Sequence, residues 1–147
     1  MPQVSNGNTV ALSLIEPSCS SDGSAVWCKV VKSADGSLNG SEIWISNGGL
    51  AEIFTVFAHV TVKTTAKGET KNKVTAFIVE RGLGGVSNGI PEDKMSIKCS
   101  NTTELYFEDV KIPAENFLGR EGQGFTVGMQ ILNNGRYGMA ADLSETM

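Results

Sequence analysis

The sequence predicts a mainly β protein with one helix at its C-terminal end. Between residues 9 and 110, runs rich in β-branched and aromatic residues alternate with clusters of Gly, Asn, Asp and Ser, a pattern typical of short strands joined by turns. After residue 124 the apolar residues recur every three or four positions, which indicates a helix face. The chain has 147 residues, of which 40% are hydrophobic, and this composition fits about one globular domain.

The expected strands are, in chain order, 9–15, 25–32, 38–46, 53–63, 74–80, 94–98 and 103–110. Asp35-Gly36 predicts a hairpin turn between the second and third of these strands, and the polar residues 67–69 predict another between the fourth and fifth. The glycine-rich stretch 82–89 lacks the GxGxxG dinucleotide pattern, because Ser87 stands where the third glycine is needed, and we interpret it as turns. Residues 112–118 are expected to leave the sheet.

The expected helix would bury one apolar face. That face is formed by Phe125, Met129, Leu132, Arg136, Met139 and Leu143. Gly128, Gly135 and Gly138 each lower helix stability by about 1 kcal/mol relative to alanine, so the helix needs tertiary support. We therefore expect it to fold back on the β body, to join another chain, or to fray.

Charge and cysteine usage exclude several classes of protein. The formal net charge of −4 argues against a nucleic-acid partner, since phosphate binding needs clustered Lys and Arg. The three cysteines lack CxxC spacing, which favours reduced thiols and predicts no metal site. The sequence holds neither a membrane-spanning apolar run nor a signal or transit peptide pattern.

Two stretches carry candidate site residues. In residues 42–49, Trp44 offers a flat ring and Ser46 a hydroxyl on the same side of a strand, a combination that suits a planar heterocyclic cofactor. The alternative is a core tryptophan before a tight turn. In residues 16–23, Ser20 and Ser21 lie in a loop whose amides and hydroxyls suit an anion such as phosphate, and the alternative is a plain polar loop.

Several ordered motifs, taken together, resemble the acyl-CoA dehydrogenases. They are 12–18 (LSLIEPS), 44–49 (WISNGG) and 107–116 (FEDVKIPAEN), while 53–58 (IFTVFA), 75–81 (TAFIVER) and 131–136 (ILNNGR) are most similar to the very-long-chain branch and its nearest paralogue. The resemblance implies the β-barrel-like middle domain of that family over residues 1–118. Residues 119–147 would then be the linker and the first helix of a truncated C-terminal helical domain, so the chain resembles a fragment or short form of the enzyme.

The resemblance also implies the ligands and their contacts. FAD would contact Leu12, Leu14, Ile15, Ser20, Ser21, Trp44, Ile45 and Ser46, with Ser46 donating to flavin N5, the atom that accepts the hydride. The acyl-CoA would contact Ser21, Asn72, Asn133, Asn134, Gly135 and Arg136, with Arg136 at the nucleotide end. Ile15 stands where the family usually has threonine and Ser20 where it has glycine. FAD is expected to bind weakly, because in the family it is also held by groups outside this segment and by a neighbouring subunit.

No catalytic residue is identified. The family abstracts an α proton with a glutamate beyond residue 147 or, in a minority, at the position of Gly135. The resemblance implies α,β-dehydrogenation of long-chain fatty acyl-CoA in mitochondrial β-oxidation, with electron-transfer flavoprotein as electron acceptor and a possible homo-oligomer. We expect this chain alone to be inactive. The alternative is a non-catalytic β-module of the same fold, used for interaction or assembly.

Overall fold

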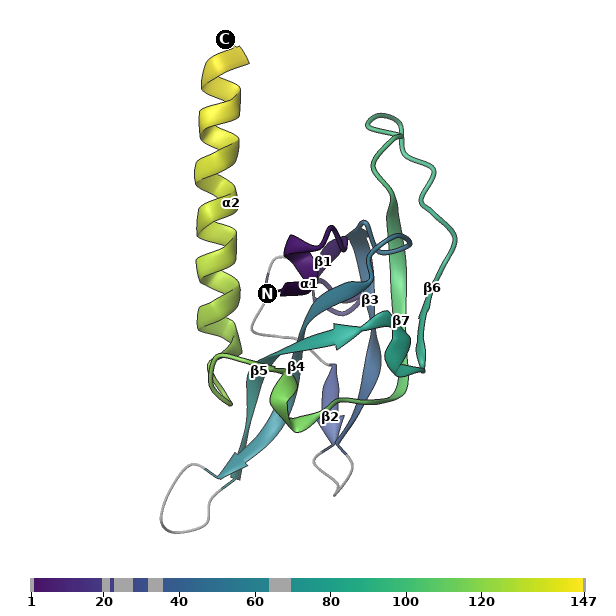
Figure 1. Cartoon of the computed structure of the whole chain (residues 1–147). Coiled ribbons are helices and arrows are strands. Elements are labelled where there is room, and N and C mark those ends of the chain that lie inside the picture. Colours follow the sequence, from purple (N-terminus) through teal and green to yellow (C-terminus); the bar gives the residue numbers. More distant parts are fainter. Residues whose placement is uncertain (1, 20–21, 23–27, 32–35, 64–69, 147) are drawn as a thin grey trace.

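The computed structural model describes residues 2–19, 22, 28–31, 36–63 and 70–146, and its fold is mainly β with one long helix at the C-terminal end (Figure 1). The strands are β1 (Val10–Ser13), β2 (Lys29–Val31), β3 (Ser37–Ser46), β4 (Ile53–Lys63), β5 (Thr70–Glu80), β6 (Val86–Asn88), β7 (Thr102–Lys111) and β8 (Phe117–Leu118). The helices are α1 (Pro2–Ser5), the 3-10 turns η1 (Arg81–Leu83) and η2 (Ala114–Asn116), and α2 (Gly124–Thr146). The predicted fold class is confirmed.

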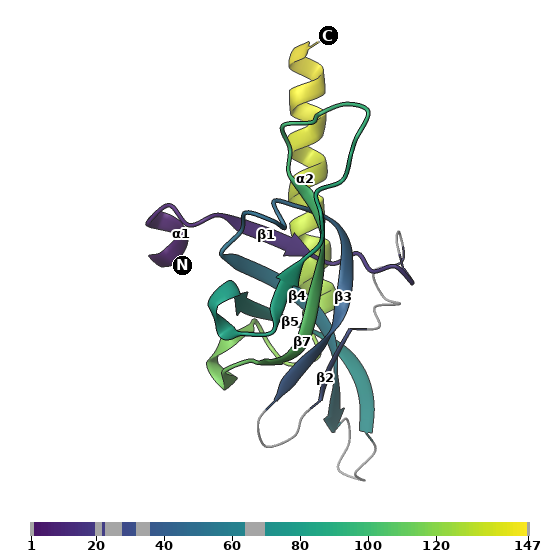
Figure 2. The ribbon, with the colours of Figure 1, turned by 90° about the vertical axis from the view of Figure 1, so that its right-hand side faces the viewer.

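Strand β4 is the centre of the sheet. It pairs with β5 in antiparallel register from Ile53↔Glu80 to Lys63↔Thr70, while β1 and β2 run parallel to it on the other side. The order is β6-β7-β3-β2-β4-β5-β8, with β1 also paired to β4, and the strands bend around a shared interior (Figure 2). Both predicted hairpins, β2–β3 and β4–β5, are therefore present, although their turns include residues outside the described ranges.

Three short predictions along the sheet were wrong. Residues 94–98 form bends and turns and not a strand. Their apolar side chains Met95 and Ile97 are exposed and have no core to pack against, and the Lys94 ammonium donates to Ser100 O at 2.7 Å. The glycine-rich stretch contains the short strand β6. Just before it, a side chain at Gly85 would collide with the Glu108 carbonyl, so glycine permits the close pairing of β6 with β7. Residues 117–118 add β8 to β5 after the chain has left β7.

The core has two parts because β4 is buried on both faces. Phe54 and Val56 pack with Leu38, Leu105 and Phe107 in the main interior of the sheet. A second, smaller cluster lies on the outer face of β4 and β5, where helix α2 covers Phe57, Val74 and Ala76 with help from Leu12, Leu14, Leu118, Val127 and Ile131. Burial of each large side chain stabilises the fold by about 1.5–3 kcal/mol.

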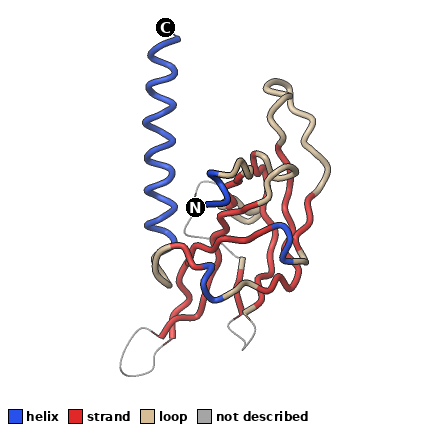
Figure 3. The backbone as a smooth tube through the Cα atoms, in the orientation of Figure 1, coloured by secondary structure: helices blue, strands red, loops and turns tan. Residues whose placement is uncertain are grey.

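Helix α2 packs on the sheet only near its N-terminus. A Cβ at Gly124 would meet the backbone of Thr75 and Ala76, and a Cβ at Gly128 would lie 3.3 Å from the Phe57 ring, so glycines allow the close contact. From residue 133 onward the described helix is exposed and extends away from the strands (Figure 3). Neither α2 nor the other described helices are long and apolar enough to cross a membrane.

The predicted packing face of this helix was wrong. Phe125, Met139 and Leu143 are 45%, 60% and 57% exposed. The helix instead contacts the sheet through Gly124, Val127, Gly128 and Ile131, about a third of a turn away from that face. Glycines decide which face of α2 approaches the sheet most closely. The prediction considered only where the large apolar side chains recur along the helix, so it missed this effect.

Candidate functional site

Trp44 and Ser46 form an exposed wall at the end of β3. Trp44 is 54% exposed and Ser46 is exposed, while Ile45 between them is 2% exposed and points into the core. The prediction that Trp44 and Ser46 share one side of a strand is consistent with this arrangement, and the core-tryptophan alternative is not. Ile45 can contact a ligand at this wall only through its backbone.

A β-bulge turns Trp44 outward. Glu42 pairs with Leu105 and Ile45 with Thr103, so β3 has one residue more than β7 between these pairs. In a regular strand, residues two positions apart such as Glu42 and Trp44 face the same side. The bulge places them on opposite sides, because Glu42 is fully buried and Trp44 is exposed. Trp44 adopts φ 56°, which costs a bulky residue about 1–2 kcal/mol. Strain of this kind is concentrated at functional sites.

The turn after the wall is tied to the segment that leads into β7. Asn47 donates its backbone N–H to Asn101 O at 2.6 Å, and Gly49 N–H donates to the Asn101 side chain at 2.9 Å. A Cβ at Gly48 would collide with the buried Thr103 hydroxyl, so glycine is required there. The wall therefore ends in a fixed turn.

Arg81 closes this turn from the other side, and sequence reasoning missed it. Its Nη2 donates to Gly48 O at 2.5 Å and its Nε to Ala51 O at 2.7 Å. The guanidinium also lies 5.1 Å from the centroid of the Phe54 ring. Arg81 is part of a motif that the sequence analysis used only for resemblance, and nothing in its local pattern points to residue 48.

The N-terminal candidate stretch runs beside the same wall. Ile43 N–H donates to Ile15 O at 2.8 Å, so the backbone of the stretch is joined to β3 one residue before Trp44. Leu12, Leu14 and Ile15 are each half-buried, and Leu12 and Leu14 pack with Phe57 beneath α2. The structure therefore brings the Ile15 backbone next to β3, while Leu12 and Leu14 lie against the cluster beneath α2 and Ser20 and Ser21 lie outside the described residues.

The predicted acyl-CoA residues are not gathered at one place. Asn72 is exposed on β5, where it accepts a 2.9 Å hydrogen bond from the Thr61 hydroxyl. Asn133, Asn134, Gly135 and Arg136 are exposed on α2. This helix begins beside β5 and extends away from the β4–β5 hairpin (Figure 1), which puts Arg136 about 18 Å along the axis from Gly124. A ligand that touches Asn72 and Arg136 together would have to be long.

Glu42 is an unusual neighbour of the wall. It lies on the inner side of the bulge, fully buried, and burial together with the nearby Glu16 carboxylate raises its pKa to about 9. Neither of its carboxylate oxygens has a hydrogen-bond partner among the described residues. Sequence reasoning did not single out this residue, because a glutamate on an alternating strand is expected to be exposed.

Comparisons with known proteins point to one family. The sequence profile of the family described as "Acyl-CoA dehydrogenase, middle domain" matches residues 11–110. The rat mitochondrial very long-chain specific acyl-CoA dehydrogenase is 56% identical over 151 residues, an alignment that covers 100% of this chain and 23% of the relative. The chain thus spans about a quarter of the length of that protein.

Solved structures give the same result. The structure of butyryl-CoA dehydrogenase from Megasphaera elsdenii superposes with a TM-score of 0.79 at 44% identity and covers 95% of this chain and 36% of its own. An acyl-CoA dehydrogenase from Bacillus anthracis, determined in complex with FAD, gives a TM-score of 0.76 at 39% identity, with coverage of 86% and 21%.

Proposed function

Because the chain belongs to the acyl-CoA dehydrogenase family and carries its middle domain, we propose that it supplies the flavin wall of an FAD-dependent enzyme that dehydrogenates long-chain fatty acyl-CoA. The observation that carries this proposal is the exposed pair Trp44 and Ser46, which the β3 bulge presents to solvent. The flavin would stack on Trp44. Ser46 would donate to N5, where electron density develops as the hydride arrives.

The remaining flavin contacts in the proposal follow from the order of the chain. Ile15 lies beside β3 through the Ile15–Ile43 hydrogen bond, and it would pack against the cofactor edge together with Leu12 and Leu14. Ser20 and Ser21 would approach the pyrophosphate. Ile15 has no hydroxyl, and a buried polar edge of the flavin left without that donor costs about 1–3 kcal/mol. FAD binding to this chain alone is therefore expected to be weak.

The acyl-CoA site would use a different part of the molecule. We propose that Arg136 neutralises the phosphates of CoA with Asn133, Asn134 and Gly135 around it, while Asn72 and Ser21 contact the ligand elsewhere. The exposure of Arg136 supports this role because the guanidinium is accessible to an anion. Dehydrogenation also needs a carboxylate at the α carbon, and Gly135 holds the position where a minority of the family has it. We propose that the chain alone does not catalyse the reaction.

The cellular setting follows from the relatives. The rat and human relatives, very long-chain specific acyl-CoA dehydrogenases, are named as mitochondrial, and we propose the mitochondrion for this chain too. Electron-transfer flavoprotein would then reoxidise the flavin. A homo-oligomer is also proposed, because Tyr137, Met139 and Leu143 are exposed on the part of α2 that does not contact the sheet.

Titration of FAD with the purified chain tests the flavin wall. We expect flavin fluorescence and absorbance to change only at high micromolar protein, with Trp44→Ala and Ser46→Ala each weakening binding by about fivefold or more, equivalent to about 1 kcal/mol. Tyr137→Ala and Ser87→Ala are matched controls, since both residues are exposed and lie away from the wall. An unchanged flavin signal at high micromolar protein would contradict the proposal.

An activity assay tests the missing base. The purified chain, supplied with FAD, a long-chain acyl-CoA and an artificial electron acceptor, is expected to show no turnover above the free flavin. Measurable turnover would mean that a group of this chain acts as the base, and it would contradict the proposal.

The alternative function, a non-catalytic module of the same fold, also has one observation in its favour. More than half of α2 is exposed, so a partner protein or a second copy has a helix face to bind. Light scattering after gel filtration separates the two cases when it is combined with the flavin titration. Oligomers without any FAD response favour the module.

A further inference from the structure

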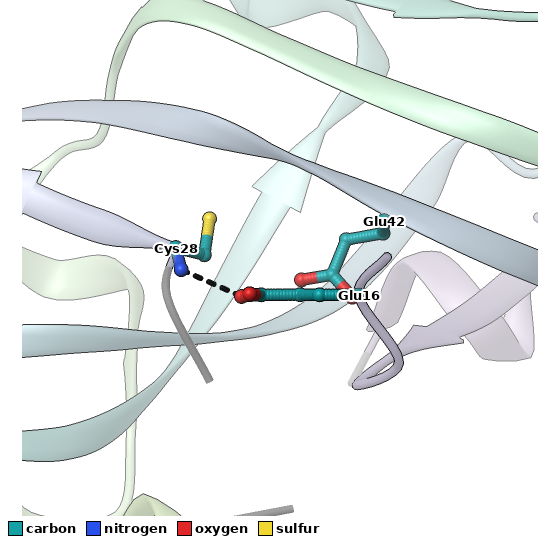
Figure 4. Close-up of side chains that lie close together, drawn as sticks. All are labelled: Glu16, Cys28 and Glu42. Atoms are coloured by element: carbon teal, nitrogen blue, oxygen red, sulfur yellow. Dashed lines mark hydrogen bonds between the residues drawn. The ribbon is translucent and has the colours of Figure 1, made fainter. Parts of the chain in front are cut away.

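Glu16, Cys28 and Glu42 meet in the interior although they come from separate segments. Glu16 follows β1, Cys28 precedes β2, and Glu42 lies on β3. Figure 4 shows the Glu42 carboxylate directed toward Glu16, with Cys28 beside them. A carboxylate oxygen of each glutamate and the Cys28 sulfur all lie within 4.8 Å of one another. The three residues are 3%, 2% and 0% exposed in the order given.

The carboxyl group of Glu42 is buried, and neither of its oxygens has a hydrogen-bond partner among the described residues. The second carboxylate, Glu16, is fixed in place, because Cys28 N–H donates to its Oε1 at 2.6 Å and the Ser18 hydroxyl to its Oε2 at 3.3 Å. Glu42 cannot stay charged in this buried position beside a second carboxylate without compensation. Either a proton or a cation must neutralise it.

The site is accessible from the surface. A pocket of about 290 Å³ is lined by Glu16, Pro17, Ser18, Cys28, Gly40 and Ser41. Two of the three clustered residues therefore border solvent space even though their own exposure is small. Gly40 leaves room for the Cys28 sulfur beside β3, since a Cβ at residue 40 would collide with that sulfur. A hydrated ion has a route to the sulfur and to the Glu16 carboxylate.

We propose that Glu16, Cys28 and Glu42 bind a divalent cation of the zinc class. One thiolate and two carboxylates are ligands that Zn²⁺ accepts, and three protein ligands leave a fourth position for water from the pocket. Tetrahedral coordination at Zn–S of about 2.3 Å and Zn–O of about 2.0–2.2 Å places ligand atoms roughly 3.5 Å apart, so the three side chains would close by about 1 Å around the ion. The cation would balance the Glu16–Glu42 repulsion and tie the segment after β1 to β2 and β3.

This inference differs from the sequence-based expectation of no metal. That expectation depended on CxxC spacing, whereas these ligands are 12 and 14 residues apart along the chain and meet only through strand pairing. The proposal does not depend on flavin binding, because none of the three side chains belongs to the wall formed by Trp44 and Ser46.

Cobalt titration of the chelator-treated chain tests the site, because a cobalt–thiolate bond gives a charge-transfer band in the near ultraviolet. We expect a band that saturates at one Co²⁺ per chain and is displaced by Zn²⁺, and we expect Zn²⁺ to raise the melting temperature. Cys28→Ser should remove the band, and Glu42→Gln should remove the zinc-dependent rise in melting temperature. Cys99→Ser is the matched control, since Cys99 is an exposed cysteine outside the cluster.

Glu42→Gln also shows whether a lost zinc effect comes only from a misfolded variant. Glutamine has the shape of glutamate without its charge, so the metal-free variant is expected to melt no lower than the metal-free parent chain. The proposal is overturned if the parent chain shows no cobalt band. It is equally overturned if the band survives in Cys28→Ser or disappears in Cys99→Ser, or if the zinc effect persists in Glu42→Gln.

Discussion

The backbone N–H of Ile43 donates a 2.8 Å hydrogen bond to the carbonyl oxygen of Ile15. This bond joins the N-terminal candidate stretch to the strand that carries Trp44 and Ser46. It also places the backbone of residue 15 next to the flavin wall that we propose. The character of the side chain at this position should therefore affect flavin affinity directly.

Ile15→Thr is expected to tighten FAD binding by about fivefold, because the new hydroxyl can hydrogen-bond the flavin and such a bond contributes about 1 kcal/mol. Fluorescence titration measures the change. Ile15→Val is the matched control, since valine has the shape of threonine without the hydroxyl. Equal affinities for the threonine and valine variants would show that residue 15 does not face a polar edge of the cofactor.

Arg81→Met is expected to lower the free energy of unfolding by about 1–3 kcal/mol, because the Gly48 and Ala51 carbonyls lose charged donors. Urea unfolding followed by circular dichroism measures this loss. FAD affinity should also fall, since the turn that ends the wall is no longer held. Arg120→Met, at an exposed arginine, should change neither quantity.

Gly124→Ala and Gly138→Ala should have opposite effects on stability. A Cβ at Gly124 would lie 2.6 Å from the Thr75 backbone, so alanine forces α2 off the sheet and lowers the melting temperature. A Cβ at Gly138 meets no neighbouring atom within 4 Å, and there alanine should raise helix stability by up to about 1 kcal/mol. Differential scanning calorimetry compares the two variants, and a stabilised Gly124→Ala chain would contradict the packing of α2.

The stability of the metal-free chain should fall as the pH rises from 5 to 9. The pKa of Glu42 is about 9 in the folded chain and 4.5 when unperturbed, so between these values the folded state holds a proton that the unfolded state has lost. The stabilisation is complete below pH 4.5 and is lost as the pH passes through 9. The slope is at most about 1.4 kcal/mol per pH unit.

Urea unfolding at several pH values in the presence of a chelator measures this slope, and Glu42→Gln should remove most of it. The Glu16 carboxylate faces Glu42 and stays in place in that variant. Burial also raises the pKa of the Cys19 thiol above its ordinary value of 9.0, so this thiol contributes a slope only above that pH and not between pH 5 and 9. The same steep slope in parent and variant would exclude Glu42 as its source.

Much of the fold followed from local pattern. Alternation and turn residues identified the long strands β3, β4, β5 and β7, because each is half-buried or bounded by glycine and polar residues. Short elements were missed. β6 and β8 contain few residues and have no periodic signal, and they exist only because β7 and β5 offer them a free edge.

The candidate site was predictable only in part. Trp44 and Ser46 were identified as neighbours on one side of a strand, and the structure exposes both. The bulge that separates Trp44 from Glu42 depends on β7, and the contact of Arg81 with Gly48 spans 33 residues. Contacts between residues so far apart in the chain cannot be predicted from the residue spacing of a single sequence.

The sequence by itself determined the mainly β class and the ring and hydroxyl on one side of a strand, because these depend on residue type and short-range periodicity. The family was indicated by the resemblance of several ordered motifs. Only the tertiary structure decided which face of α2 packs, since close approach depends on Gly124 and Gly128 meeting β5 and Phe57. It alone also brought Glu16, Cys28 and Glu42 together, because strand pairing joins segments that are distant along the chain.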